Sequence, residues 1–192
     1  MLDDARSGEV RSYLSAIKDD QAALIQLTPE AMDLFQAGIE DRPGVVYQST
    51  ASMAPPPSPI GWVKTILRPW VTVSHAIFTA LHAVTARLDE RYPCAAHHAG
   101  DENEALLERV FGRTPGARAN DGVVPLRSQI WGKVVWAGYA DHLDVLGHFR
   151  GGPTAPMHND WLSSGSSFDQ MGFEALTRAL AAGMRAASRP AP

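Results

Sequence analysis

A tight polar turn at residues 120–125, Asn-Asp-Gly-Val-Val-Pro, restricts the fold of this chain more than any other stretch. Asparagine, aspartate and glycine in succession favour a chain reversal, because the polar side chains bond to nearby backbone and glycine tolerates a positive φ. Downstream, residues 141–145 read Asp-His-Leu-Asp-Val and follow an apolar stretch at 133–137 that predicts a β-strand. If the turn and the loop meet at one edge of a sheet, Asp121 contacts His142. The carboxylate would then hold the imidazole in one tautomer and stabilise its protonated form.

Size and composition are those of one ordinary globular domain, residues 1–192. Hydrophobic residues make up 45% and charged residues 20% of the chain, which excludes a disordered protein. The formal net charge of −4 and the scattered basic residues give no indication of a surface for nucleic acid or anionic lipid. No run approaches the roughly 20 apolar residues of a transmembrane helix. The single cysteine, Cys94, excludes an internal disulfide framework.

The first residues, Met-Leu-Asp-Asp, carry acids where a signal peptide would carry lysines followed by an apolar run. The expected location is therefore cytoplasmic if Met1 is the true start of the protein. An internal start in a longer reading frame would remove that inference.

Helical and strand patterns alternate along the chain, which predicts an α/β fold. A helix is expected to begin at Thr28 and Pro29 and to bury Met32, Leu34, Phe35 and Ile39. The other expected elements are a weak helix at 9–27, strands at 45–49 and 133–137, helices at 70–88 and 104–111, the latter ended by Gly112, and a last helix from Ser167 or Asp169.

Several of these segments together resemble the C-terminal half of bacterial triacylglycerol lipases and related esterases of the α/β-hydrolase fold. The resemblance covers residues from about 20 to 187. Its points are residues 27–32 (Leu-Thr-Pro-Glu-Ala-Met), 45–47, 120–125, 141–149, 160–162 and the closing helix. It implies the C-terminal part of a doubly wound, mainly parallel sheet, and a protein that acts on ester or lipid substrates.

By that resemblance Asp121 is the acid and His142 the general base of a catalytic triad. The family carries its nucleophilic serine in a Gly-x-Ser-x-Gly elbow upstream of the matched region, and no such motif occurs in this sequence. The serines at 163–167 follow His142 and are expected to cap the last helix. The chain alone is therefore expected to be inert toward esters, and to depend on a missing N-terminal half if one is supplied.

Residues 54–103 are expected to form an insertion within the domain. After the proline-rich stretch at 54–59, an apolar helical segment could act as a lid over an acyl-binding cleft, as lipases require. A helix buried in the core is an equally good interpretation of the same pattern. The residues that would line a lid are Trp62, Trp70, Ile77, Phe78 and Leu81.

Some of these lipases also bind a structural calcium through the aspartate two residues after the base, here Asp144, and Asp101 could be a second ligand. The resemblance implies no other cofactor. The residues Cys94, His97 and His98 fit no zinc-binding spacing well. Two functions remain open: a lipase-like ester hydrolase that holds the acid and base, and a non-catalytic remnant of the fold that serves as a binding module.

Overall fold

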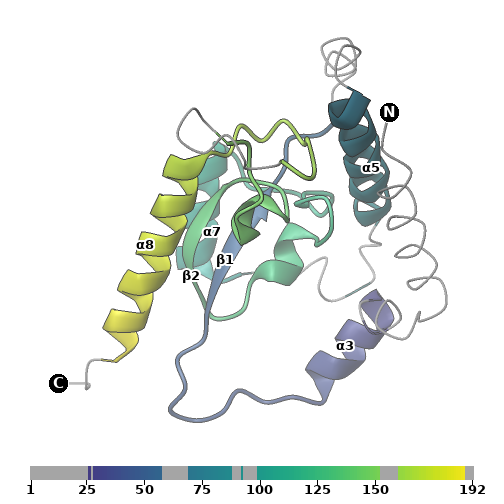
Figure 1. Cartoon of the computed structure of the whole chain (residues 1–192). Coiled ribbons are helices and arrows are strands. Elements are labelled where there is room, and N and C mark those ends of the chain that lie inside the picture. Colours follow the sequence, from purple (N-terminus) through teal and green to yellow (C-terminus); the bar gives the residue numbers. More distant parts are fainter. Residues whose placement is uncertain are drawn as a thin grey trace, which may run out of the picture. The chain divides into compact units, whose positions relative to one another are not determined.

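The computed structural model describes residue 26 and residues 28–57, 69–87, 92, 99–151 and 160–188. Two compact units are distinguished, Met1–Arg42 and Pro43–Pro192. Within the described residues there are four α-helices and a two-stranded parallel sheet (Figure 1). The chain is thus a mixed α/β protein, as the sequence predicted at this level. Four of the residues named above lie outside the described residues: Trp62, Cys94, His97 and His98. The expected helix at 9–27 also lies outside them, except for residue 26.

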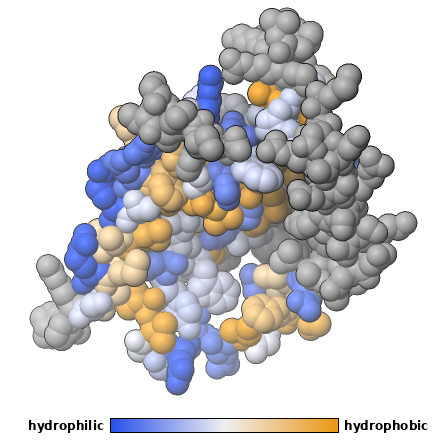
Figure 2. All heavy atoms as spheres, viewed as in Figure 1, coloured by the Kyte–Doolittle hydropathy of each residue, from blue (hydrophilic) through white to orange (hydrophobic). Residues whose placement is uncertain are grey.

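The helix of the first unit, α3 (Pro29–Ala37), begins as the sequence predicts. Thr28 Oγ1 accepts a hydrogen bond from the amide of Ala31, and proline occupies the first turn. The apolar stripe, however, is not buried: Leu34 is 77% and Phe35 60% exposed, and hydrophobic side chains lie on the surface of α3 (Figure 2). An amphipathic pattern predicts an apolar face, but what covers that face depends on tertiary packing.

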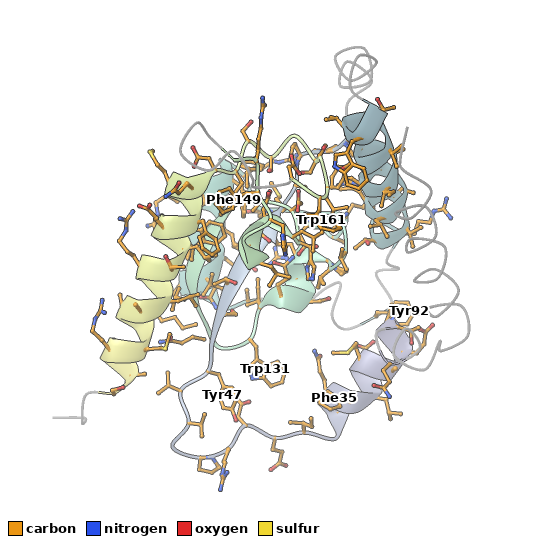
Figure 3. All side chains as sticks on the ribbon, viewed as in Figure 1. Phe35, Tyr47, Tyr92, Trp131, Phe149 and Trp161 are labelled. Atoms are coloured by element: carbon orange, nitrogen blue, oxygen red, sulfur yellow. The ribbon has the colours of Figure 1, made fainter. Side chains whose placement is uncertain are left out.

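The sheet of the second unit pairs β1 (Gln48–Met53) with β2 (Lys133–Tyr139) in parallel. Its first strand begins later than expected, because regular pairing starts only at Gln48; the preceding Val46 is exposed. The register shifts between Ser49 and Thr50, which marks a β-bulge. Below the strand starts, the Tyr47 and Trp131 rings meet edge to face at 6.5 Å (Figure 3).

Helices cover both faces of this sheet. Ala137 packs into the apolar cluster of α7 (Asp101–Phe111), whereas its neighbour Trp136 packs against a cluster that includes Phe173 of α8 (Gln170–Ala187). Since successive side chains of a strand point to opposite faces, α7 and α8 lie on opposite faces of the sheet. The α7 side holds the larger core, which comprises Ala51, Met53, Leu107, Phe111, Leu126, Ile130 and Val134.

The C-terminal end of α7 and the start of α8 match the sequence signals, whereas α7 begins at Asp101 rather than at the expected Glu104. Gly112 ends α7 in the left-handed conformation at φ 70°, and Asp169 caps α8 by accepting a hydrogen bond from the amide of Gly172. The serines before Asp169 therefore are not the cap. None of the described helices is long and apolar enough to cross a membrane.

The helix α5 (Pro69–Thr85) is amphipathic in an unusual sense. Its inward face carries Ser74 and His75, which are buried and bonded to the segment at 161–163: Ser74 Oγ donates to the Trp161 carbonyl at 2.8 Å, and His75 Nδ1 lies 2.7 Å from the Ser163 carbonyl. Its outward face is apolar, and its large exposed residues are Trp70, Val73, Ile77, Leu81 and Val84. We call these five residues the apolar stripe of α5.

Gly132 provides a test of the close packing between the residues that precede β1 and β2. Its φ is 66°, and a Cβ atom there would overlap the carbonyl of Tyr47. We expect Gly132→Ala to lower the free energy of unfolding by about 2–3 kcal/mol, because both the backbone conformation and the close approach become strained. Urea denaturation measures the loss. Gly116→Ala is the control, since nothing lies within 4 Å of that position, and an equal effect of the two substitutions would contradict the expectation.

Candidate acid–base site and carboxylate cluster

Asp121 is held in a turn that bonds to its own side chain. The amides of Val123 and Val124 donate to Asp121 Oδ1 at 2.9 and 2.7 Å, and the amide of Asp121 donates to the Val124 carbonyl at 3.2 Å. The side chain of Asp121 is only 3% exposed. Because a buried carboxylate is costly without partners, these amides hold the group in position and satisfy one of its oxygens.

The preceding Asn120 anchors the turn to its surroundings. Its Oδ1 accepts from the amide of Gly122 at 2.8 Å, and its Nδ2 donates to the carbonyl of His82 in α5 at 3.4 Å. The Asn120 carbonyl accepts from the amide of Ala54, directly after β1. The Asn-Asp-Gly turn therefore lies at the carboxyl end of β1.

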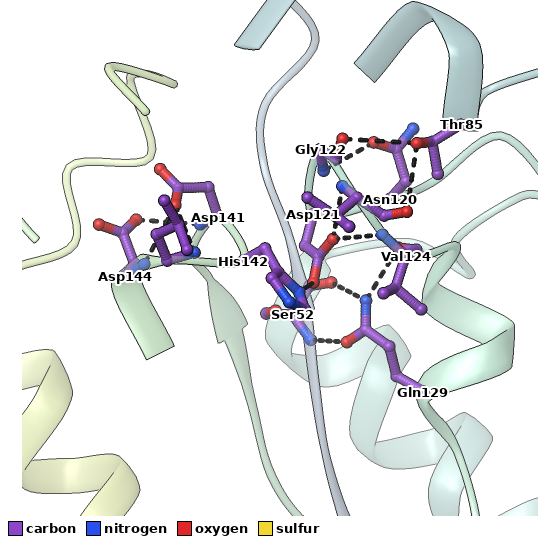
Figure 4. Close-up of polar contacts among 12 residues, drawn as sticks. Ser52, Thr85, Asn120, Asp121, Gly122, Val124, Gln129, Asp141, His142 and Asp144 are labelled. Carbon is purple, nitrogen blue, oxygen red and sulfur yellow. Dashed lines mark hydrogen bonds and ion pairs between the residues drawn. The ribbon is translucent and has the colours of Figure 1, made fainter. Parts of the chain in front are cut away.

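His142 follows β2 and meets this turn, as the sequence predicted. His142 Nδ1 lies 2.9 Å from Asp121 Oδ2, and the backbone amide of His142 donates to the Asp121 carbonyl at 2.9 Å (Figure 4). A carboxylate can only accept, so Nδ1 carries the proton of the neutral ring and Nε2 keeps its lone pair. The His142 side chain is 34% exposed and can be reached from solvent.

The electrostatics of the pair favour a charged imidazole. The hydrogen bond to Asp121 raises the pKa of His142 above its ordinary value; burial opposes this, and the negative charges of Asp121 and Asp141 add to the rise. The arrangement suits a general base that must hold a proton briefly beside a carboxylate.

No serine among the described residues is hydrogen-bonded to His142. Two serines after it bond to other groups: Ser164 Oγ donates to Asp141 Oδ2, and Ser166 Oγ donates to Asp144 Oδ2, each at 2.6 Å. They therefore hold carboxylates rather than act as helix caps or as a nucleophile for the base.

Asp144, the expected metal ligand, belongs to a cluster of three aspartates. Ligand atoms of Asp141, Asp144 and Asp160 lie within 4.8 Å of one another, so this group could hold a metal ion. Asp101, the other expected ligand, lies in the first turn of α7 and is not one of the three. The resemblance pointed to Asp144 as a ligand but not to Asp160, which comes from later in the chain.

The three carboxylates repel one another in a buried setting. Burial and the charge of Asp141 raise the pKa of Asp144 to about 8, and the same two causes raise the pKa of Asp160 to about 6. Burial likewise raises the pKa of Asp141. Asp160 Oδ1 is buried without a hydrogen-bond partner. A cation would satisfy that oxygen and relieve the repulsion.

The residues expected to line a lid separate into two groups. Trp70, Ile77 and Leu81 lie on the apolar stripe of α5 and are exposed, as a lid surface requires. Phe78, in contrast, is fully buried beside Leu162 and Gly122. It therefore packs the helix against the turn at residues 120–125, which we call the acid turn. One face of this helix is thus exposed and the other buried, and the lid stays a prediction.

Comparisons with known proteins add no relative. No protein-family model matches the sequence, and no curated protein and no solved structure is significantly similar to it. Function therefore has to be inferred from the chemistry of the site itself.

The Asp121–His142 pair can be tested by titration. We expect His142 to titrate above 6.5, and Asp121→Asn to lower its pKa, because the amide removes the negative partner. A raised histidine pKa stabilises the fold at pH values below 6.5, and this contribution is lost as the pH rises through the folded-state value. NMR of the ring carbon protons measures the titration. Asp169→Asn is the control, and a pKa of His142 unchanged by Asp121→Asn would contradict the assignment.

Proposed function

We propose that this chain carries the acid and the base of a lipase-like carboxylic ester hydrolase. The observation that carries the proposal is the 2.9 Å contact between His142 Nδ1 and an Asp121 carboxylate held by two backbone amides. A buried acceptor on one side of an accessible imidazole is the arrangement that prepares Nε2 to take a proton.

The location of the pair supports the same proposal. Asp121 lies at the carboxyl end of β1 and His142 at the carboxyl end of β2. In open α/β sheets this end of the strands is where ligands bind. The two parallel strands with helices on both faces are compatible with the C-terminal part of an α/β-hydrolase sheet, which the resemblance of the sequence suggested.

In this mechanism His142 Nε2 accepts the proton of a serine hydroxyl while the serine oxygen attacks the ester carbonyl. The negative charge of Asp121 stabilises the imidazolium that forms. The imidazolium then returns the proton to the leaving alcohol, and a water repeats the sequence to release the acid. The serine is not among the described contacts of His142, so the pair awaits a nucleophile from elsewhere.

The apolar stripe of α5 is an argument that the ester substrate has a lipid-like acyl group. Thr85 at the end of α5 donates its one hydroxyl proton most closely to the Leu81 carbonyl, at 3.0 Å, and its Oγ1 lies 3.4 and 3.3 Å from the carbonyls of Gly122 and Val123, so the helix end lies against the acid turn. An apolar surface that is tied to the turn of the catalytic acid is suited to contact the hydrocarbon part of an ester.

The ester-hydrolase proposal predicts different activities for two forms of the protein. The 192-residue chain alone should not hydrolyse p-nitrophenyl butyrate. A longer polypeptide, read from an upstream start in the gene that encodes a Gly-x-Ser-x-Gly segment, should hydrolyse it. In that polypeptide Asp121→Asn and His142→Ala should each lower kcat by about 10³–10⁴-fold, because the base loses its orientation or is absent.

Asp169→Asn is the matched control for these rates, since asparagine also caps a helix. Hydrolysis that survives His142→Ala, or a longer polypeptide with the serine motif but no activity, would contradict the proposal. Serine-dependent turnover by the 192-residue chain would contradict its expected inertness.

A non-catalytic role is the second candidate, favoured by one observation. The amide of His142 also donates to the Asp121 carbonyl, so this contact joins the two loops whether or not the side chains perform chemistry. If the chain is a binding module, substitution of Asp121 or His142 lowers its stability. No form of the protein then has an enzymatic activity for these substitutions to reduce.

We further propose that the cluster of Asp141, Asp144 and Asp160 holds a structural calcium ion. Three carboxylates within 4.8 Å, one of them with a buried unbonded oxygen, fit a hard cation that takes oxygen ligands. Bound there, calcium would fix the loop that carries His142 and would take no part in proton transfer.

The calcium proposal predicts a pH-dependent stability. With a chelator present, Tm should fall as the pH rises from about 4 to 8, because folded Asp144 keeps its proton up to about 8 whereas the unfolded residue loses it near 3.8. Millimolar calcium at pH 7.5 should then raise Tm by about 5 °C. Differential scanning fluorimetry measures both effects.

Asp144→Asn should remove the response to calcium, while Asp101→Asn, which alters an acid outside the cluster, should leave it intact. An equal response in the wild type and in Asp144→Asn would argue against the site.

A further inference from the structure

Gln129 is a side chain that the proposed chemistry does not use, yet it contacts the acid turn directly. It is the last residue of the 3-10 helix η1 (Leu126–Gln129). Leu126 within this helix and Ile130 after it are both buried in the core cluster of α7. The core therefore fixes the backbone from which the Gln129 side chain extends.

The amide of Gln129 makes three hydrogen bonds. Its Oε1 accepts from the amide of Ser52 at 2.7 Å, and its Nε2 donates to the Ser52 carbonyl at 3.0 Å and to the Val124 carbonyl at 3.1 Å (Figure 4). This pattern also assigns the amide orientation, because a flipped amide would place its oxygen against two carbonyl oxygens.

The contact with Ser52 replaces a neighbouring strand. The carbonyl of Met53 accepts from Ala140 after β2, so the backbone groups of Ser52, one residue earlier, point to the opposite edge of β1. Gln129 satisfies both of these groups at once. It thereby pairs the outer edge of β1 at the level of the candidate site.

The contact with Val124 leads to the acid. The Val124 carbonyl accepts from both Gln129 and the amide of Asp121, and the Val124 amide donates to Asp121 Oδ1. The peptide groups on either side of Val124 are thus fixed, one by Gln129 and the other by the carboxylate that faces His142.

We propose that Gln129 is a positioning residue that joins the end of β1 to the acid turn and so holds the Asp121 carboxylate against His142 Nδ1. The proposal rests on the proposed function, since it assigns to Gln129 the alignment of that acid–base pair. Only glutamine satisfies all three contacts: glutamate cannot donate, asparagine is one methylene too short, and methionine forms none of these bonds.

The test compares wild type, Gln129→Met, Gln129→Glu and a control, Gln170→Met. The exposed side chain of Gln170 donates a hydrogen bond to Glu174 on the next turn of α8. The first readout is the tautomer of neutral His142, from the ring nitrogen chemical shifts at high pH. The second is amide hydrogen exchange of Val123 and Val124 relative to the buried core residue Leu107. Neither readout requires enzymatic activity, so failure of this proposal is distinguishable from failure of the ester-hydrolase proposal.

In Gln129→Met the Nε2–H tautomer of His142 should become populated. Exchange at Val123 and Val124 should accelerate about tenfold relative to Leu107, as expected when one or two hydrogen bonds that hold the turn are lost. Gln129→Glu keeps only the bond from the Ser52 amide, so it should show the same change and provides the readout if Gln129→Met does not fold. An unchanged tautomer in a folded variant, or a loss of protection spread uniformly over the core and the turn, would overturn the proposal.

Discussion

The candidate site depends on one buried carboxylate. Asp121 has almost no exposed surface and would be costly to bury with its charge unless every oxygen had a partner. Its Oδ1 accepts from two backbone amides and its Oδ2 faces His142. The hydrogen bonds of this carboxylate therefore join the turn to the loop after β2, and the neighbouring Asn120 carbonyl joins the turn to the end of β1. The geometry that suits proton transfer is also the geometry that makes this part of the fold stable.

Local chemistry made part of the structure predictable. Thr28 before proline and Gly112 after an apolar stripe are capping signals that act within one turn of helix, and both were confirmed. The contact of Asp121 with His142 was predictable because turn residues and strand ends together restrict where the two side chains can lie. These features need no knowledge of distant segments.

Features that depend on distant segments were not predictable. Gln129 carries no motif, and its partner Ser52 lies 77 residues away. Asp160 reaches Asp144 only because the later loop returns to the site, and the serines at 164 and 166 were expected to cap a helix that Asp169 caps instead. The pattern of α5 predicted a helix but left its orientation open, which the hydrogen bonds of Ser74 and His75 and the burial of Phe78 decide. A periodicity identifies a face, and only tertiary partners decide which face is buried.

The pairing of β1 with β2 has a consequence for how the molecule acquires its structure. The two strands are separated by a long crossover that includes α5 and α7, so their hydrogen bonds are among the most non-local in the chain. Contacts of this kind form slowly, because a large loop must close before any of them is gained. During synthesis on the ribosome, β1 emerges well before its partner exists. The turn that carries Asp121 bonds to Ala54 directly after β1, so it can reach its place at the end of that strand only once this large loop has closed.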